Sequence, residues 1–359
     1  MNKRIKNKSR ISKLMKFIVV LSLGLILYFG FNTHVANLYS NLTSSLSDMH
    51  LSRRSNPVEV DTLKDIVELD LDTTNEDHEA LRLLELEKLA LELKELELEN
   101  RRNLLEELRP ILVDLLNQTP GRISLSLFCI YTEELIDING DEMYFSASTI
   151  KLPTHMMVAE AVERGELAWD DMLTIGSNHW ISGSGVLQFN KQIGSQLTLR
   201  DAMRYSIRYS DNVGHRMMTS SIIENFRHYE VGLDNHHWDL TRKVSERYLN
   251  SAPVMGRMFI TANQLTEIFK VLYNDREVVS GYEKIIDYMI NSSWDNRFKT
   301  ELSTGIVAHT PGWTYPYSHD SGLFFTDLPY ILVVLTHGVH DAPQFLSRIS
   351  DKILMQLDS

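Results

Sequence analysis

The chain has 359 residues, of which 43% are hydrophobic and 9% aromatic, so it is long enough and apolar enough to bury a sizeable core. Its formal net charge is -12, but residues 1–16 hold seven Lys and Arg and no acid, which leaves -19 for the remainder. Outside this basic tail no positive stripe is available to meet a phosphate backbone, which argues against nucleic acid as a partner.

An apolar segment follows the basic tail. Residues 17–31 carry no charge, and a basic stretch followed by an apolar one is typical of a membrane-targeting segment with a cytoplasmic N-terminus. We predict an uncleaved, single-pass transmembrane signal-anchor over 17–38, in the cell membrane. A secretory signal peptide that is cleaved is the alternative, although His34 fits a small-residue cleavage site poorly. In both cases the rest of the chain lies outside the cytoplasm.

Two segments separate this anchor from the rest of the chain. Residues 39–74 are predicted to be a linker, and residues 75–103 an acidic helical spacer rich in Leu and Glu, with a seven-residue repeat. A stripe at 3-4 spacing consists of Leu86, Leu89, Leu93 and Leu96. It indicates either a coiled coil through which the protein self-associates, or a single amphipathic helix with a solvated acidic face.

Residues 104–359 have the pattern of a compact domain. The predicted elements, in chain order, are a helix over 111–116, a hairpin of 123–131 and 134–138, a helix from the S-x-x-K motif to 162, helices near 199–209, 212–224 and 262–273, strands over 322–326 and 330–336, and a helix over 343–357. This order predicts an α/β (α+β) fold, with an antiparallel sheet flanked by helices and an inserted all-helical lobe. The lone Cys129 lies in an apolar run and is predicted to be a buried hydrophobic residue.

Ser148 and Lys151 form the only S-x-x-K in the chain. Residues i and i+3 of a helix share a face, so the amine can take the proton of the hydroxyl as it attacks a carbonyl carbon. Such a spacing also occurs by chance on solvated helices, so the pair needs support from other motifs.

Two further motifs follow in order. Ser210-Asp211-Asn212 is the only S-D-N, and the segment from Glu246 to Asn250 is the only E-x-x-L-N. The S-x-x-K, S-D-N and E-x-x-L-N motifs stand in this order and at compatible spacings. Through them, residues from about 104 to 359 resemble the penicillin-recognising serine enzymes, most closely the class A β-lactamases. The resemblance implies a β-lactamase/transpeptidase-like fold and an acyl transfer reaction.

The resemblance also assigns roles to individual residues. Ser148 would be the acylated nucleophile, Lys151 its proton partner, and Ser210 the group that passes a proton to the leaving amine. Asn212 would hold the amide side chain of the substrate. The backbone N–H of Ser148, at the start of a helix, would be one oxyanion donor.

Glu246 would decide what happens to the acyl-enzyme. In class A enzymes a glutamate on a loop activates the hydrolytic water, and Asn250 would share that water. The alternative is an acidic residue at an exposed helix end, with no catalytic role.

The K-T-G hallmark of the family is absent. The matching stretch is Thr310-Pro311-Gly312, so Thr310 stands at the lysine position. The family lysine holds the substrate carboxylate, and its loss removes a contact of about 1.5–3 kcal/mol. The N–H of Trp313 would be the second oxyanion donor. His309 either supplies part of the missing charge or is a structural strand residue.

The predicted chemistry needs no cofactor or metal. His236-His237 and His319-Asp320 have no third ligand at metal-site spacing, so we expect structural or surface roles for them. The predicted function is a membrane-anchored extracytoplasmic serine hydrolase of the β-lactamase type, acting on a β-lactam or a peptidoglycan-stem-like amide. The alternatives are a D,D-peptidase and an envelope binding or scaffold protein with weak or no turnover.

Overall fold

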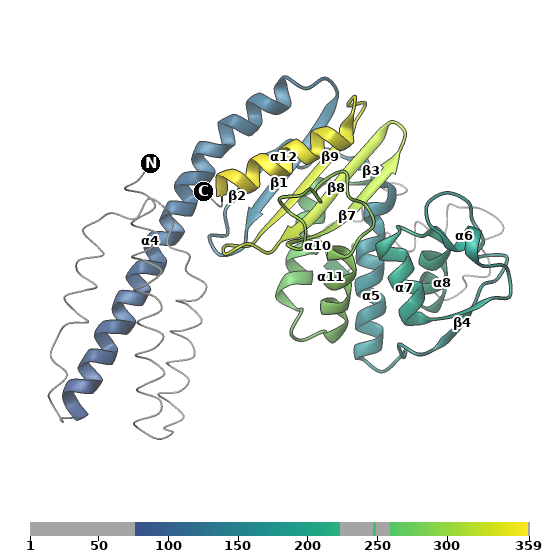
Figure 1. Cartoon of the computed structure of the whole chain (residues 1–359), viewed down its shortest axis with the longest axis horizontal. Helices are drawn as coiled ribbons and strands as arrows, with labels where there is room; N and C mark the ends of the chain where they lie inside the picture. The colour runs from purple at the N-terminus through teal and green to yellow at the C-terminus, as the bar shows by residue number, and fades with distance from the viewer. Residues whose placement is uncertain (1–75, 223–246, 249–258, 358–359) are drawn as a thin grey trace. The chain divides into compact units, whose positions relative to one another are not determined.

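The computed structural model describes residues 76–222, 247–248 and 259–357 (Figure 1). The predicted signal-anchor and linker, together with Glu246 and Asn250, lie outside the described residues. Within the described ranges, no helix combines the length and the apolar character that a membrane crossing requires. The chain divides into two compact units, residues 1–106 with 357–359, and residues 107–356.

The predicted helical spacer is present as part of a longer helix. Helix α4 (Glu76–Asn117) continues without a break across the predicted boundary between residues 103 and 104, and it contains Pro110. In its last part Leu108, Leu112 and Leu116 are buried at four-residue intervals, which is the stripe expected of a helix that packs on one face. Self-association through the earlier leucine stripe stays a prediction.

The second unit contains most of the predicted elements. In chain order they are β1 (Arg122–Cys129), β2 (Leu135–Ile138), β3 (Tyr144–Phe145), the 3-10 helix η1 (Ala147–Ile150), α5 (Lys151–Glu163), β4 (Met172–Thr174), α6 (Leu187–Asn190), β5 (Gln196–Thr198), α7 (Leu199–Arg208), α8 (Asn212–Ile222), β6 (Phe259–Ile260), α10 (Ala262–Asn274), α11 (Ser280–Ile290), β7 (Val307–Thr314), β8 (Tyr317–Phe324), β9 (Tyr330–His337) and α12 (Ala342–Leu357). The sequence patterns did not predict α11 or the short strands β3 to β6.

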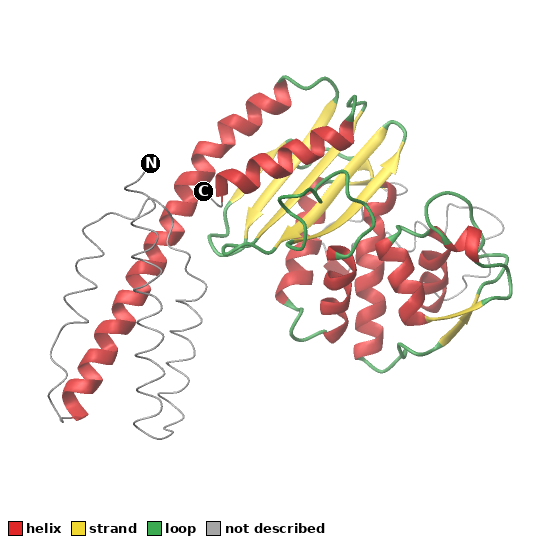
Figure 2. Ribbon diagram, viewed as in Figure 1, coloured by secondary structure: helices red, strands yellow, loops and turns green. Residues whose placement is uncertain are grey.

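A five-stranded antiparallel sheet forms the centre of this unit. Its strand order is β2-β1-β9-β8-β7, so the first predicted hairpin pairs with the last strands of the chain and β7 is an edge strand. Figure 2 shows α12 along one face of the sheet, with α10 and α11 on the other side and the helical lobe around α7 and α8 beyond α5. The predicted antiparallel sheet with flanking helices and a helical lobe is therefore confirmed, and Cys129 is buried as expected.

Side chains cap the helices that support the site. Thr198 accepts a hydrogen bond from the N–H of Asp201 at the start of α7. At the start of α10, Thr261 and Gln264 form a capping box. Each such cap satisfies donors that the first helical turn leaves open and contributes about 1 kcal/mol, which fixes where these helices begin.

Candidate active site

Ser148 lies in η1, directly before α5, and not in the α-helix that the sequence predicted for it. The preceding residue, Ala147, has a φ of 47°, in the left-handed region that residues with a Cβ rarely adopt. Because Ser148 stands in the first turn of η1, its N–H has no acceptor within the helix. The half-buried Ser148 is thus presented with its N–H available, as the oxyanion role requires.

Lys151 brings the first two motifs together. Its Nζ donates hydrogen bonds to the backbone oxygen of Ser210 at 2.5 Å, to Oδ1 of Asn212 at 2.7 Å and to the hydroxyl of Ser210 at 3.3 Å. Burial lowers the pKa of Lys151 to about 7, against the opposing effect of the Asp211 carboxylate. The amine can therefore lose its proton near neutral pH.

The Ser148 hydroxyl forms no hydrogen bond with Nζ of Lys151 in this structure. Lys151, one helical turn further on, directs its three donors at Ser210 and Asn212. Three donated hydrogen bonds are the pattern of the protonated ammonium. Loss of one proton leaves a lone pair on Nζ, which is the state that can accept the proton of the nucleophile.

Asp211 is a residue of the candidate site that sequence reasoning overlooked, although it stands inside the S-D-N motif. Its carboxylate is buried and accepts hydrogen bonds from three backbone N–H groups, those of Val186 at 2.6 Å, Leu187 at 2.8 Å and Gly214 at 2.9 Å. It thereby ties the loop before α6 to the first turn of α8. The S-D-N motif drew attention to Ser210 and Asn212 but gave no sign of this role for Asp211. The loop that Asp211 holds is 24 residues away in the sequence, so no local pattern links the two.

Strand β7 lies directly against η1. A Cβ added at Gly312 would lie 2.9 Å from the backbone oxygen of Ser146 and 3.0 Å from Cγ2 of Thr149, so only glycine allows this approach. Thr310, two residues earlier, shares the same face of the strand. The stretch at the K-T-G position therefore borders the nucleophile, as the resemblance implied.

Pro311 indicates which edge of β7 is open. Proline has no N–H, and in a strand it is tolerated where its nitrogen faces away from the neighbouring strand. Since β7 pairs with β8 alone in the sheet, the nitrogen of Pro311 faces the open edge. The N–H of Trp313, two residues later, points the same way, which is the direction that the second oxyanion donor needs.

His309 lies on the opposite face of β7. Its Nδ1 is 2.8 Å from Oδ2 of Asp320, and both side chains are fully buried. Asp320 also accepts a hydrogen bond from the N–H of Phe298. His309 therefore brings no charge to the face that carries Gly312, and of the two interpretations the structural one holds.

His319 connects the sheet to the nucleophile loop, which gives a specific form to the structural role that the sequence analysis expected for it. Its Nε2 donates to the backbone oxygen of Phe145 at 2.8 Å, and its Nδ1 accepts from the N–H of Thr336 at 3.0 Å. Burial lowers the pKa of His319 to about 4, so the ring is neutral at pH 7. His319 and Asp320 point to opposite faces, and the described residues contain no cluster of three or more His, Cys, Asp or Glu that could hold a metal.

The two residues after Glu246 are anchored on α5. The buried carboxylate of Glu160 accepts hydrogen bonds from Nε of Arg247 at 2.9 Å, from the hydroxyl of Tyr248 at 3.1 Å and from the hydroxyl of Tyr282 at 2.6 Å. Burial is the main cause that raises the pKa of both tyrosines, so both remain donors. The roles of Glu246 and Asn250 stay predictions.

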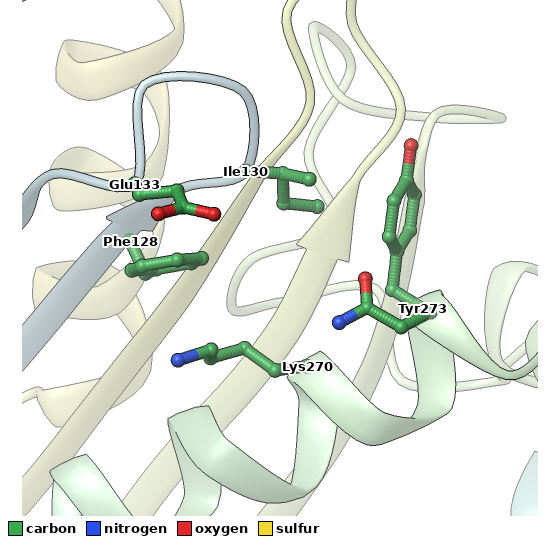
Figure 3. A pocket seen from close by; sticks show the side chains of 6 residues that line it. Phe128, Ile130, Glu133, Lys270 and Tyr273 are labelled. Atoms are coloured by element: carbon green, nitrogen blue, oxygen red, sulfur yellow. The ribbon is translucent and has the colours of Figure 1, made fainter.

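A cavity of about 240 Å³ lies elsewhere, between the end of β1 and the end of α10 (Figure 3). Its lining residues are Phe128, Ile130, Glu133, Lys270, Tyr273 and Asn274. Nζ of Lys270 lies 4.6 Å from the centre of the Phe128 ring and 3.0 Å from the carboxylate of Glu267. None of the motif residues lines this cavity, so it is not the site of the predicted chemistry.

Comparisons with known proteins give the family and the fold. A family model described as the β-lactamase enzyme family matches residues 106–357. The chain is similar to β-lactamase VEB-1 of Pseudomonas aeruginosa, with 21% identity over 199 residues, or 54% of this chain and 67% of that protein. Among solved structures it is similar to PBP-A, with a TM-score of 0.57, 18% identity and coverage of 71% of this chain and 94% of that chain. A β-lactamase from Xanthomonas campestris pv. campestris gives a TM-score of 0.59 at 16% identity, covering 71% and 99%.

Proposed function

The chain belongs to the β-lactamase enzyme family, and on that premise we propose that it is a serine hydrolase that forms an acyl-enzyme on Ser148 and releases it to water. The observation that carries this proposal is the buried Lys151, with a pKa of about 7 and hydrogen bonds to both Ser210 and Asn212. A base whose pKa lies near the working pH is what acylation of a serine requires.

The proposed reaction follows from the positions of these groups. Neutral Lys151 accepts the proton of the Ser148 hydroxyl as its oxygen attacks the carbonyl carbon of the amide. The N–H groups of Ser148 and Trp313 stabilise the negative charge on the carbonyl oxygen. Ser210, which lies 3.3 Å from Nζ, passes the proton on to the leaving nitrogen, and the C–N bond breaks. The ester is then hydrolysed by a water that Glu246 activates and Asn250 helps to hold.

The substrate is proposed to be a β-lactam or a peptidoglycan-stem-like amide, and the protein to act outside the cytoplasm, anchored by residues 17–38. The basic tail and the uncharged segment after it support this location. Self-association through residues 75–103 is a further proposal that rests on the leucine stripe. Membrane fractionation and sedimentation of the full chain, with and without residues 1–38, test both.

The function is tested by incubating the full chain in mild detergent with benzylpenicillin and following intact mass and product together. Transient acylation with product release is expected, and Ser148→Ala should abolish the adduct. Glu246→Ala should prolong the life of the adduct; an unchanged lifetime removes its proposed role. The absence of any adduct or product with β-lactams and stem-peptide amides would contradict the proposal.

A D,D-peptidase or a binding protein with weak turnover is the second candidate. Thr310-Pro311 at the K-T position favours the binding protein with weak turnover, because the strand offers no cation to a substrate carboxylate. In that case the adduct is stable in the wild-type protein and disappears in Ser148→Ala. The lifetime of the wild-type adduct therefore separates the two candidates.

A further inference from the structure

The edge strand that borders Ser148 presents no cation. Strand β7 contains neither Lys nor Arg, and on its face toward η1 the side chains are the hydroxyl of Thr310 and the hydrogen of Gly312. The alternate residues are Pro311 and the exposed Trp313. A carboxylate laid along this strand would therefore lose its water without meeting an ammonium or guanidinium group of β7, which is unfavourable.

A buried guanidinium lies on the other face of the strand pair. Arg297 is 2% exposed, and its Nη groups donate to Asn296 and to the hydroxyl of Ser318. The charge of the Asp320 carboxylate, on the same face as His309, raises the pKa of Arg297 against the effect of burial. Ser318 and Asp320 share one face of β8, so the contacts of Arg297 are with the face opposite to the one that carries Gly312.

Two further cations among the described residues have protein acceptors. Nε of Arg208 donates to the backbone oxygen of Asn291 at 2.9 Å, and Nζ of Lys299 donates to the backbone oxygen of Ser292 at 2.8 Å. Lys151 is committed to Ser210 and Asn212 and acts as the base in the proposed reaction. A substrate carboxylate would have to compete with these bonds.

Aromatic side chains occupy the end of β7 instead. Trp313 is 62% exposed and Tyr315, directly after the strand, is 89% exposed. The N–H of Trp313 points to the open edge, and its indole ring, on the face of β7 opposite to Gly312, is exposed at the same end of the strand. Large exposed aromatic rings next to a polar anchoring group are typical of sites that bind an apolar or aromatic group.

We propose that the acyl donor of this enzyme is an uncharged amide or lactam, which carries an apolar or aromatic group and no carboxylate beside the scissile bond. Thr310 and Trp313 determine this preference. The inference rests on the proposed acylation of Ser148, and it names the substrate class of that same site.

The test compares two probes that differ at one carboxyl group, benzylpenicillin and its uncharged methyl ester, on the full chain in mild detergent. The measured quantity is the rate constant for the Ser148 adduct, followed by intact mass. The ester should react about tenfold faster or more, because one charged group without a partner accounts for at least this factor. Thr310→Lys should lower the ratio of the ester rate to the acid rate about tenfold or more, because the new ammonium favours the acid.

Matched variants separate specificity from folding. Thr314→Lys adds the same charge on the same face of β7, four residues further on, and should leave the ratio unchanged. Trp313→Ala should slow the ester about tenfold, whereas Trp313→Phe should keep most of its rate because the ring contact remains. Thr310→Ser, which keeps a hydroxyl at this position, should retain the wild-type ratio.

The outcomes are distinct. If wild-type protein reacts with the acid as fast as with the ester or faster, the inference is wrong while the proposed function stands. An equal shift of the ratio in Thr310→Lys and Thr314→Lys also contradicts it, because position 310 would then have no special role. If neither probe forms an adduct on Ser148, the proposed function itself fails, and the inference fails with it.

Discussion

The backbone oxygen of Ser210 lies 2.5 Å from Nζ of Lys151, so two residues 59 positions apart share a buried hydrogen bond. This contact joins the S-x-x-K segment to the S-D-N segment and places the Ser210 hydroxyl 3.3 Å from the same ammonium. The positive φ of Ser210, 51°, turns its backbone oxygen and hydroxyl toward one amine. The proton path of the proposed reaction is therefore set by the shape of one turn.

The acylation rate should rise with pH through about 7, because Lys151 must be neutral to accept a proton and burial lowers its pKa to that value. Below this pH the ammonium predominates and acylation slows. Lys151→Arg should reduce the rate by about 100-fold or more at every pH, since a guanidinium is not deprotonated in proteins. Rapid-mix mass measurements of adduct formation between pH 5 and 9 check both expectations, and a flat profile would remove Lys151 as the base.

Asp211→Asn should lower the midpoint of that pH profile. The Asp211 carboxylate raises the pKa of Lys151 against the effect of burial, so removing its charge lets the pKa fall below 7. The same substitution replaces one carboxylate oxygen by an NH2 group, so either the N–H of Gly214 or the N–H groups of both Val186 and Leu187 lose their acceptor. This loss should cost about 1–3 kcal/mol of unfolding free energy. Denaturant unfolding measures the second effect. A midpoint that moves upward would contradict the electrostatic argument.

Gly312→Ala should impair acylation by displacing β7 from η1. The new Cβ would lie 2.9 Å from the Ser146 backbone oxygen, closer than real contacts allow, and overpacking of this kind costs about 1–3 kcal/mol. Thr314→Ala, at the half-exposed end of the same strand, is the control and should change neither stability nor rate. Unfolding and adduct formation are measured together, and a wild-type acylation rate in Gly312→Ala would show that the close approach is not required.

Glu160→Ala should destabilise the protein by about 2–3 kcal/mol. The substitution leaves the buried hydroxyls of Tyr248 and Tyr282 without their acceptor. A buried donor without an acceptor lowers stability by its full desolvation free energy. Glu160→Gln keeps one acceptor oxygen and should therefore lose less unfolding free energy than Glu160→Ala. Glu163→Ala, at the exposed end of the same helix, removes a carboxylate whose hydrogen bonds from Ser280 are exposed, and it controls for helix propensity. Equal losses at positions 160 and 163 in denaturant unfolding would rule out a special role for the buried carboxylate.

Stability should decrease on acidification between pH 6.5 and about 4. The folded protein holds His319 neutral down to about pH 4, whereas an unfolded histidine binds a proton near pH 6.5, so acid favours the unfolded state in this window. A pKa shift of this size corresponds to a loss of about 3 kcal/mol of unfolding free energy once the pH has fallen below both pKa values. His319→Gln, which can still donate to the Phe145 backbone oxygen, should lose less stability over the same window. Identical pH slopes for the two proteins would contradict this assignment.

The sequence by itself determined the chemistry of the candidate site and the order of its parts. The spacing of Ser148 and Lys151, and the S-D-N segment that follows, are local patterns that carry the family resemblance. Hydrophobic periodicity predicted the first hairpin, the main helices and the last two strands, because burial on one face leaves a period in the sequence. It did not predict α11, nor the break between η1 and α5 beside Ser148.

Only the tertiary structure decided which side chains meet. His319 binds the Phe145 backbone oxygen from 174 residues away, and His309 turns from the nucleophile toward Asp320 because successive residues of a strand face opposite sides. The pKa of Lys151 depends on its burial and on Asp211, neither of which is encoded in the four residues of its own motif. Protein electrostatics and packing are set by neighbours in space, and those neighbours come from distant parts of the chain.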